Sequence, residues 1–553
     1  MPKIDVSHKD LCNLIGRKLS AEQLGDEVLF AKAELDEING DMLKIDVKDT
    51  NRPDLWSAEG VAREIRAKYK PGIPKYDVRK SPFVVNVEKS VESVRPYTAC
   101  AVVKGLKIND TVMSQLLQLQ EKVAGTFGRN RKEVAIGVYD LGRIKFPITY
   151  KSISPEGIKF IPLDFKEKMT PKEILERHPK GKEFGHLLNG KSMYPLFIDS
   201  EGEVLSVPPI INSDHSGKVT EKTTDVFIEC SGFDKRFLYT ALNVLVSALQ
   251  ERGGIIYGVK VVYDKKSEVT PDLAPKKFRV SVNYINKVSG LQLPVKDIVK
   301  LLEKSLYSAT VKGKNIELLY PAYRQDLMHE RDIVEDVLIS YGFNKIEPVV
   351  PKLVTKGGIS KEQSFVEKVT EIMTGAGFQE ILSYTLTSKD NIFDRMNISG
   401  HAVELEKPTS ANWCVLRTWM LPSLMEFLAK NKHVEYPHTI FEIGTSVIQD
   451  NSETRAKDVT KLAAAVSATT VNYETISSSL DALLKNLGVE YTLRKTSHSS
   501  FIEGRVAEIV SSGKHLGLIG EIHPAVLNNW ALEKPVVAFE IDLEEVFELL
   551  RKK

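Results

Sequence analysis

Three segments rich in proline, glycine and charged residues interrupt this chain, and each of them breaks the surrounding hydrophobic pattern. They are KPGIPKYDVRKSPF (70–83), YDKKSEVTPDLAPKK (263–277) and EPVVPKLVTKGG (347–358). The chain has 553 residues, which is too long for one hydrophobic core. A usual domain size of roughly 150 residues favours about three to five units. We therefore predict several separately packed domains.

Local patterns predict both helices and strands in every part of the chain. Residues 57–69 carry apolar side chains at helical spacing, and Ser57 is placed to cap that helix. A predicted helix at 233–253 is surrounded by strand-like runs at 83–88, 97–106, 133–141 and 253–263. Residues 278–346 are predicted to form strand, turn, helix, strand and helix. We predict an α+β multidomain fold with domains at 1–85, 86–268, 269–346 and 347–553.

Composition excludes several classes of protein. The 76 Lys and Arg residues nearly balance the 74 Asp and Glu residues, so any nucleic-acid contact must come from local patches. The four cysteines are far apart in sequence, which argues against a zinc site and a disulfide framework and indicates a reducing compartment. The first ten residues lack the apolar core of a signal peptide, and polar residues interrupt the apolar run at 238–249. We expect a cytoplasmic protein without a membrane span.

Residues 323–343, YRQDLMHERDIVEDVLISYGF, crowd four carboxylates together at the start of a predicted helix: Asp326, Asp332, Glu335 and Asp336. Like charges three or four residues apart on a helix destabilise it. In one interpretation they cap the first helical turn and are neutralised by Arg324 and Arg331. In the other they hold a hard cation such as Mg²⁺, which binds through oxygen ligands. Spacing alone leaves both interpretations open.

The same stretch resembles the B5 module of the β subunit of phenylalanyl-tRNA synthetase. Other segments resemble that subunit in matching order: DTNRPDLWSAEGVAREI (49–65), PPIINSDHSGKV (208–219), DVFIECSGFD (225–234), EKPTSANWCVLRTWMLPSLMEFLAKN (406–431), FEIGTSV (441–447) and GLIGEIHPAVLNNWAL (517–532). The resemblance therefore covers nearly the whole chain. It implies an N-terminal B1-like module, a B3/B4 editing domain of the archaeal and eukaryotic type, a B5 domain and a B6/B7 domain like a class II synthetase catalytic domain.

In this family four acidic residues of B5 bind Mg²⁺. By position they correspond to Asp326, Asp332, Glu335 and Asp336, so the resemblance implies Mg²⁺ as a structural or allosteric cofactor. Asp336 stands where the family more often has Glu, which shortens the reach of the ligand but keeps its chemistry.

The final block lacks the arginine motifs with which class II synthetases clamp ATP. Arg417 follows a strand-like run, but no G-x-G-x-x-R stretch occurs where GLIGEIHP stands. An arginine at such a junction usually pairs with a carboxylate, and we favour that structural role for Arg417. The resemblance implies an α subunit in an (αβ)₂ heterotetramer, with ATP and phenylalanine bound at the α-subunit site and tRNA(Phe) as the shared substrate.

The chemistry expected of this chain itself is removal of tyrosine from mischarged tRNA(Phe). An apolar pocket rejects an added hydroxyl only about 10²-fold, so accuracy requires a second hydrolytic site. We predict Asn212, His215 and Ser216 near the ester, and Glu229 or Asp234 near the phenol. The polar loop at 208–219 could instead be a turn whose side chains bond their own backbone.

Two further questions stay open at this level. The segment at 125–146 carries Arg129, Arg131, Lys132, Arg143 and Lys145, which could form a phosphate-binding patch or a solvated face. The alternatives to a subunit that edits tRNA are a non-enzymatic assembly scaffold and a free-standing aminoacyl-tRNA deacylase.

Overall fold

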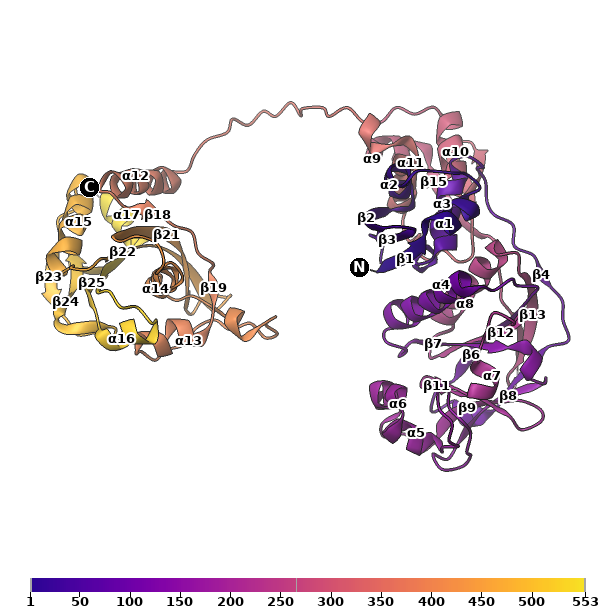
Figure 1. Ribbon diagram of the computed structural model, residues 1–553. Coiled ribbons are helices and arrows are strands. Elements are labelled where there is room, and N and C mark those ends of the chain that lie inside the picture. The colour runs from indigo at the N-terminus through magenta and orange to yellow at the C-terminus, as the bar shows by residue number, and fades with distance from the viewer. Residues whose placement is uncertain (1, 265, 552–553) are drawn as a thin grey trace. The chain divides into compact units, whose positions relative to one another are not determined.

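The computed structural model describes residues 2–264 and 266–551, which form two compact units. The first unit comprises residues 1–349 and the second comprises residues 350–553. Residues 346–360 between them form no helix or strand, in agreement with the predicted break at 347–358 (Figure 1). No helix among the described residues is long and apolar enough to cross a membrane. The division of the first unit into three domains stays a prediction.

The N-terminal part of the first unit is a small antiparallel sheet with helices packed on it. The strand order is β1 (Lys3–Ser7), β3 (Met42–Val47), β2 (Ala33–Asn39). The helices are α1 (His8–Ile15), α2 (Ala21–Val28) and α3 (Ala58–Ala67). Ser57 caps α3 as predicted, because its hydroxyl accepts a hydrogen bond of 3.0 Å from the backbone N–H of Gly60.

A large mixed sheet forms the middle of this unit. Its main path runs β11-β10-β9-β8-β5-β13-β6-β12-β7, and β4 and β14 also pair with β13. Its strands are β4 (Val78–Arg79), β5 (Val84–Val87), β6 (Tyr97–Lys104), β7 (Val134–Asp140), β8 (Ile148–Ile153), β9 (Tyr194–Ile198), β10 (Val204–Val207), β11 (Ile211–Asn212), β12 (Val226–Gly232), β13 (Ile255–Val262) and β14 (Ser267–Thr270). Its helices are α4 (Asp110–Lys122), α5 (Pro171–Arg177), α6 (Pro179–Phe184), α7 (Asp214–Gly217) and α8 (Lys235–Glu251).

Helices α4 and α8 lie between the large sheet and the N-terminal elements, as Figure 1 shows. Leu242 and Leu245 of α8 share one buried apolar cluster with Ile228 of β12 and with Val6 of β1. The opposite face of the sheet has its own core, which includes Tyr139 and other buried side chains of β5, β6, β8, β9 and β12. The two faces of β12 therefore pack into different cores.

A smaller three-stranded sheet with three helices ends the first unit. Its order is β15-β17-β16, with β15 (Lys276–Ser281), β16 (Ser308–Lys312) and β17 (Asn315–Tyr320). The helices are α9 (Val282–Ser289), α10 (Val295–Lys304) and α11 (Glu330–Tyr341). The sequence predicted a turn where α9 stands. That prediction was wrong, because Ser281 caps a helix there and Gly290 ends it in the left-handed conformation.

The second unit is built on a seven-stranded, mainly antiparallel sheet in the order β18-β21-β22-β26-β25-β24-β23. Its strands are β18 (Gln379–Glu380), β21 (His438–Gln449), β22 (Ala456–Ser467), β23 (Thr492–Lys495), β24 (Phe501–Ser511), β25 (Lys514–Ile522) and β26 (Val536–Asp542), with β19 (Leu386–Thr387) and β20 (Val415–Leu416) paired separately. Its helices are α12 (Lys361–Gly375), α13 (Lys389–Ile392), α14 (Leu421–Lys430), α15 (Tyr473–Asn486), α16 (Pro524–Asn529) and α17 (Leu543–Arg551). The predicted multidomain α+β fold is confirmed.

Candidate functional site

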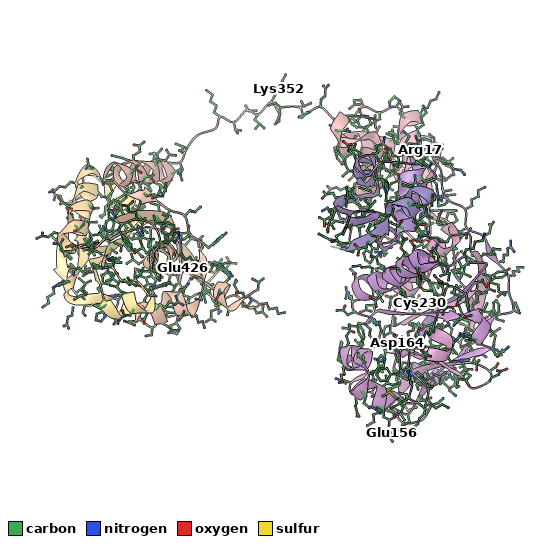
Figure 2. All side chains as sticks on the ribbon, viewed as in Figure 1. Arg17, Glu156, Asp164, Cys230, Lys352 and Glu426 are labelled. Atoms are coloured by element: carbon green, nitrogen blue, oxygen red, sulfur yellow. The ribbon has the colours of Figure 1, made fainter. Side chains whose placement is uncertain are left out.

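A cavity of about 240 Å³ is lined by residues of α4, of β7 and β12 at one end of the large sheet's strand order, and of β10 and β11 at the other end. Asn212 and Glu229, both predicted from the sequence, line this cavity together with Ser206 and Ile136. Asp164, which Figure 2 labels near this part of the molecule, also belongs to the lining. The structure therefore brings two of the predicted site residues to one concave surface.

Strand alternation explains why Glu229 is available to this cavity. Successive side chains of a strand point to opposite faces, and Ile228 and Cys230 pack with α8, so Glu229 faces the other side. On that side it meets Tyr139 of β7, the strand that pairs with β12. Residue 137 lies directly opposite Glu229 and is glycine; a Cβ there would stand 2.7 Å from Glu229 Oε1 and closer still to Tyr139. Only glycine leaves room for this pair.

Glu229 is an unusual carboxyl group. Glu229 is only 2% exposed. Its Oε1 lies 3.2 Å from the hydroxyl of Tyr139, and that hydroxyl lies 2.7 Å from Ser206 Oγ. Among the described residues, Oε2 has no hydrogen-bond partner. Burial raises the pKa of Glu229 to about 8, because a charged carboxylate is costly in an apolar environment. Near neutral pH the group is therefore mostly protonated and able to donate a hydrogen bond.

The other three predicted residues lie outside the lining of this cavity. His215 is exposed on α7, and its carbonyl accepts a hydrogen bond from Arg143. Ser216 is buried, and its hydroxyl has no partner among the described residues. Asp234 caps α8 and forms a 2.6 Å ion pair with Arg236, a hydrogen-bonded partner that holds the pKa of Asp234 below its usual value. The sequence could not separate these roles, because all three residues follow closely on Asn212 or Glu229.

Sequence reasoning missed Tyr139 and Ser206, the two hydroxyls closest to Glu229. The segment EVAIGVYDL has the apolar pattern of a buried strand, and a tyrosine within it looks like an ordinary core residue. A signal was present, because Tyr139 and Gly137 share one face of a strand two residues apart. Pairing between β7 and β12 would still have been needed to put that face against Glu229.

Two of the five basic residues predicted in the segment at 125–146 form structural contacts, whereas Arg129, Lys132 and Lys145 are exposed. Arg131 donates hydrogen bonds of 3.2 and 2.9 Å to the carbonyls of Pro209 and Ile210, and its guanidinium stacks on Phe184. It thereby holds the loop before Asn212 in place. Arg143 is bound to the His215 carbonyl in the same way. These two arginines position the loop at the cavity.

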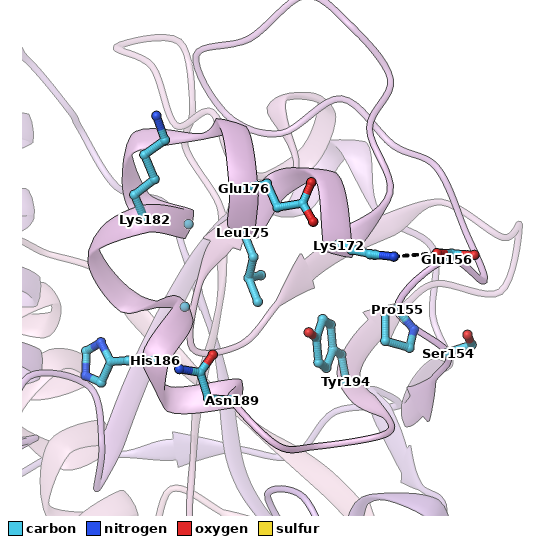
Figure 3. A pocket seen from close by; sticks show the side chains of 12 residues that line it. Ser154, Pro155, Glu156, Lys172, Leu175, Glu176, Lys182, His186, Asn189 and Tyr194 are labelled. Carbon is cyan, nitrogen blue, oxygen red and sulfur yellow. Dashed lines mark hydrogen bonds and ion pairs between the residues drawn. The ribbon is translucent and has the colours of Figure 1, made fainter.

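A larger and more open cavity of about 800 Å³ lies beside α5 and α6 (Figure 3). Lys172 and Glu156 form a 3.0 Å ion pair at its edge, and His186 and Asn189 stand on the opposite side. None of the residues predicted from the sequence lines it. This cavity is separate from the one beside Glu229.

The four crowded carboxylates of the sequence are held mainly by protein cations. Both oxygens of Asp326 accept hydrogen bonds from Arg324, at 3.0 and 2.5 Å. Asp336 Oδ2 lies 2.8 Å from Arg324 Nη1 and 2.6 Å from the Tyr307 hydroxyl. Burial alone would raise the pKa of both aspartates, but the surrounding cations, Arg324 foremost, together outweigh it and keep each pKa below its usual value.

The remaining cations come from the N-terminal part of the chain. Lys32 Nζ lies 3.0 Å from Glu335 and 3.4 Å from Asp336. Arg52 forms ion pairs with Asp54 at 2.8 Å and Glu64 at 2.5 Å, and its Nε lies 3.8 Å from Asp326. The segments 49–65 and 321–343, more than 250 positions apart, thus share one buried ion network. Arg52 and Arg324 are 2% and 1% exposed.

The predicted ligand set is not assembled around one point. Asp326 and Asp336 both bind Arg324. Asp332 Oδ2 accepts hydrogen bonds of 2.7 Å from the backbone N–H groups of Met328 and His329. Among the described residues, no group of three or more His, Cys, Asp or Glu side chains has a geometry that could hold a metal ion. The helix-capping interpretation therefore describes Asp332. Two carboxylates are left facing solvent: that of Glu335, which is half exposed, and the Oδ1 side of Asp332.

Arg417 in the second unit has the structural role favoured from the sequence. It is 2% exposed, and its Nη1 lies 2.9 Å from Glu442 on β21, whose side chain is fully buried. Its Nε donates to the Thr445 carbonyl at 2.8 Å. A guanidinium that is satisfied in this way by buried protein acceptors is not free to clamp phosphates.

Known families match three parts of this chain. The phenylalanyl tRNA synthetase beta chain CLM domain matches residues 346–543, the tRNA synthetase B5 domain matches residues 278–343, and the B3/4 domain matches residues 108–264. The cavity beside Glu229 lies within the B3/4 match, and the crowded carboxylates lie within the B5 match.

Similar proteins span the full length of the chain. The phenylalanine–tRNA ligase beta subunit of Pyrococcus abyssi is 50% identical and covers 99% of this chain and 100% of its own length. That of Pyrococcus furiosus is 49% identical with the same coverage. A solved N-terminal fragment of the phenylalanyl-tRNA synthetase beta subunit from Pyrococcus horikoshii superposes with a TM-score of 0.60 and 53% identity, covering 62% of this chain and 99% of the fragment. The chain therefore belongs to the family of phenylalanine–tRNA ligase beta subunits.

Proposed function

We propose that this beta subunit removes tyrosine from mischarged tRNA(Phe), while an alpha subunit attaches phenylalanine with the use of ATP. Membership of the family makes the chain one subunit of an aminoacyl-tRNA ligase with an alpha partner. The (αβ)₂ assembly, its cytoplasmic location, and the binding of tRNA, ATP and phenylalanine belong to the proposal. The observation that carries the editing role is the partnerless oxygen of Glu229 in a cavity of the B3/4 region.

The chemistry of Glu229 suits the recognition of a phenol. A tyrosine hydroxyl can both donate to and accept from a protonated carboxyl group, and so would supply the partner that Oε2 lacks. Phenylalanine carries no hydroxyl and would leave this buried group unsatisfied. Sites built to bond a hydroxyl discriminate about 10⁴- to 10⁵-fold against the analogue that lacks it. The cavity would therefore hold tyrosine and release phenylalanine.

Asn212 is placed to act at the other end of the substrate. Its amide lies only within a long 3.5 Å contact of the Val138 carbonyl, so an N–H remains available to the ester. Attack of water on the ester carbonyl gives an oxyanion that such a donor stabilises. The ester C–O bond then breaks, tyrosine leaves as a carboxylic acid, and the terminal ribose hydroxyl of the tRNA regains its proton. We assign no side chain as general base.

The test uses the alpha–beta complex as purified and measures release of amino acid from Tyr-tRNA(Phe) and Phe-tRNA(Phe). We expect Glu229→Ala to slow Tyr-tRNA(Phe) deacylation about 10²-fold or more, because the hydroxyl loses its partner. Asp234→Ala is the matched control, since this second carboxylate lies outside the cavity and pairs with Arg236. Equal rates for wild type and Glu229→Ala would contradict the editing role and favour an assembly scaffold. Phenylalanylation should be unchanged in both variants.

We also propose that Mg²⁺ binds at the start of α11 through Glu335 and the free oxygen of Asp332. Mg²⁺ usually takes only one or two carboxylates from a protein and keeps several waters. These two residues therefore suffice, whereas Asp326 and Asp336 are already neutralised by Arg324. The bound ion would offset the repulsion between carboxylates at the helix start and would stabilise the fold.

Thermal unfolding in Mg²⁺ and in chelator tests this proposal. Free ion at about 100 times its dissociation constant should stabilise the protein by about 2.7 kcal/mol. Glu335→Gln should abolish the difference, whereas Glu317→Gln should preserve it, although both residues are half-exposed carboxylates paired with a lysine. Identical unfolding curves for the wild type in Mg²⁺ and in chelator would contradict the metal site and leave helix capping as the role of Asp332.

A further inference from the structure

A cavity of about 560 Å³ lies between the end of α3, the end of α8 and the linker that follows α3. Its lining includes four cationic side chains and a single carboxylate: Arg63, Arg66, Lys70, Lys75 and Glu251. The linker is fixed over it partly by a 2.8 Å hydrogen bond from the backbone N–H of Gly72 to the carbonyl of Glu303. A segment that resembles a simple connector thus forms one wall of a basic cavity.

The carboxylate in this cavity is already satisfied. Glu251 Oε2 lies 2.6 Å from Arg66, and Oε1 accepts a 3.1 Å hydrogen bond from the Tyr76 hydroxyl. The ends of α3 and α8 add about one negative charge between them through their backbone dipoles. Asp54, 3.7 Å from Arg63, adds a further negative charge. The four cationic side chains still outnumber these negative charges, so the cavity retains a positive charge. Lys70 and Lys75 are exposed at its rim, and neither forms an ion pair within the described part of the chain.

Buried polar groups without partners line the same cavity. Arg63 is 2% exposed, and its guanidinium lies 4.0 Å from the centre of the Tyr323 ring. Its Nη1 donates a 3.3 Å hydrogen bond to the Tyr76 hydroxyl and lies 4.0 Å from Glu251, and its Nη2 lies 3.7 Å from Asp54. Its Nε alone has no hydrogen-bond partner among the described residues. The amide oxygen of Gln250 also lacks a partner there. Leaving a buried donor unsatisfied is costly, so a ligand that accepts a hydrogen bond from it would be favoured. The lining of the cavity therefore includes one cationic donor and one hydrogen-bond acceptor that lack partners among the described residues.

We propose that this cavity binds the phosphate group of a nucleotide-sized ligand. Phosphate oxygens would accept from Arg63 and from the two rim lysines, and a hydroxyl of the phosphate or of an adjoining ribose would donate to Gln250. The volume falls in the usual range for small-molecule sites, about 300–1,000 Å³. The ligand is either a free nucleotide or one nucleotide of an RNA strand, which share this chemistry.

The full-length subunit in its complex is titrated with adenosine 5′-monophosphate by calorimetry, and with a tRNA(Phe) transcript by fluorescence anisotropy across a range of salt concentrations. The test variant is Lys70→Gln/Lys75→Gln. The control is Lys9→Gln/Lys18→Gln, which removes two exposed lysines of the same unit that do not line the cavity. Both replacements change the charge equally and lie at the surface, so both variants should fold.

We expect the test variant to bind a phosphate-bearing ligand about tenfold or more weakly, with no change of affinity in the control variant. Weaker tRNA binding with a salt slope reduced by about one to two units identifies an RNA strand as the ligand. Weaker binding of the mononucleotide with unchanged tRNA binding identifies a free nucleotide. Unchanged affinities for both probes, or equal losses in test and control variants, would overturn the proposal. Deacylation of Tyr-tRNA(Phe) is measured separately, so this result is independent of the editing role.

Discussion

Replacing Arg324 with methionine should destabilise the first unit by about 3–5 kcal/mol, the usual cost of removing one partner from a buried ion pair. The guanidinium is 1% exposed and binds both Asp326 and Asp336. Without it, two buried aspartates would face each other with only Lys32 and Arg52 nearby. Differential scanning calorimetry of the full-length chain would show the loss as a lower Tm for the unit of residues 1–349.

Arg331→Met is the matched control, because Arg331 lies in the same acidic segment but is exposed and forms no ion pair within the described residues. Its replacement should change stability by less than about 0.5 kcal/mol. A fall in Tm no larger for Arg324→Met than for this control would show that the network contributes little.

The network also predicts a dependence on acid. Folding lowers the pKa of Asp326 and Asp336, so their contribution is present above the unfolded pKa of about 4 and is lost as the pH falls below it. Wild-type unfolding followed between pH 7 and about pH 3 should show this loss, and Arg324→Met should show less of it.

Glu229 should give the wild type the opposite dependence on pH, and Glu229→Gln should remove it. The folded protein raises the pKa of Glu229 to about 8 by burial, whereas an unfolded glutamate ionises near its ordinary value of 4.5. The stability contributed by the protonated group is therefore complete below pH 4.5 and is lost as the pH rises through 8. Glutamine copies the shape of the protonated acid and cannot ionise.

We therefore expect wild type and Glu229→Gln to have similar free energies of unfolding near pH 5. Near pH 9 the variant should be the more stable one, by on the order of 1–3 kcal/mol. Urea unfolding at a series of pH values measures this difference. Asp234→Asn is the control and should show no gain at high pH, because Asp234 carries a pKa below its usual value. Parallel pH profiles for wild type and Glu229→Gln would show that this carboxyl group is not protonated in the folded protein.

Much of the fold follows from local sequence. The helix after Ser57 begins where its cap predicts, and the strand-like runs at 97–106 and 133–141 become β6 and β7. Capping and alternation act over a few residues, so the sequence displays them directly. The turn expected before residue 290 shows the limit of this reading. Helix α9 has only eight residues, which is shorter than the window of about 11–18 residues in which a helical period is recognised.

The sequence predicted only part of the candidate site. Asn212 and Glu229 were predicted and meet in one cavity, whereas His215, Ser216 and Asp234 lie outside its lining. Residues that are neighbours in sequence lie in the same loop, but their side chains point in different directions. On a strand, the side chains of successive residues face opposite sides of the sheet. The proposed roles of Asn212 and Glu229 await the deacylation assay.

By itself the sequence determined that the chain is an α+β multidomain protein, that it breaks at 347–358, and that its ordered motifs resemble one synthetase subunit. Those properties depend on local pattern and on the identity of residues. The other two predicted breaks, 70–83 and 263–277, contain the strands β4 and β14. The sequence also predicted that Arg324 neutralises the crowded carboxylates, which it does. Tertiary structure alone added Lys32 and Arg52, because these residues lie far from the carboxylates in sequence and are brought to them by folding. It alone decided that Glu229 is protonated near neutral pH, because desolvation depends on what the folded sheet packs around a group.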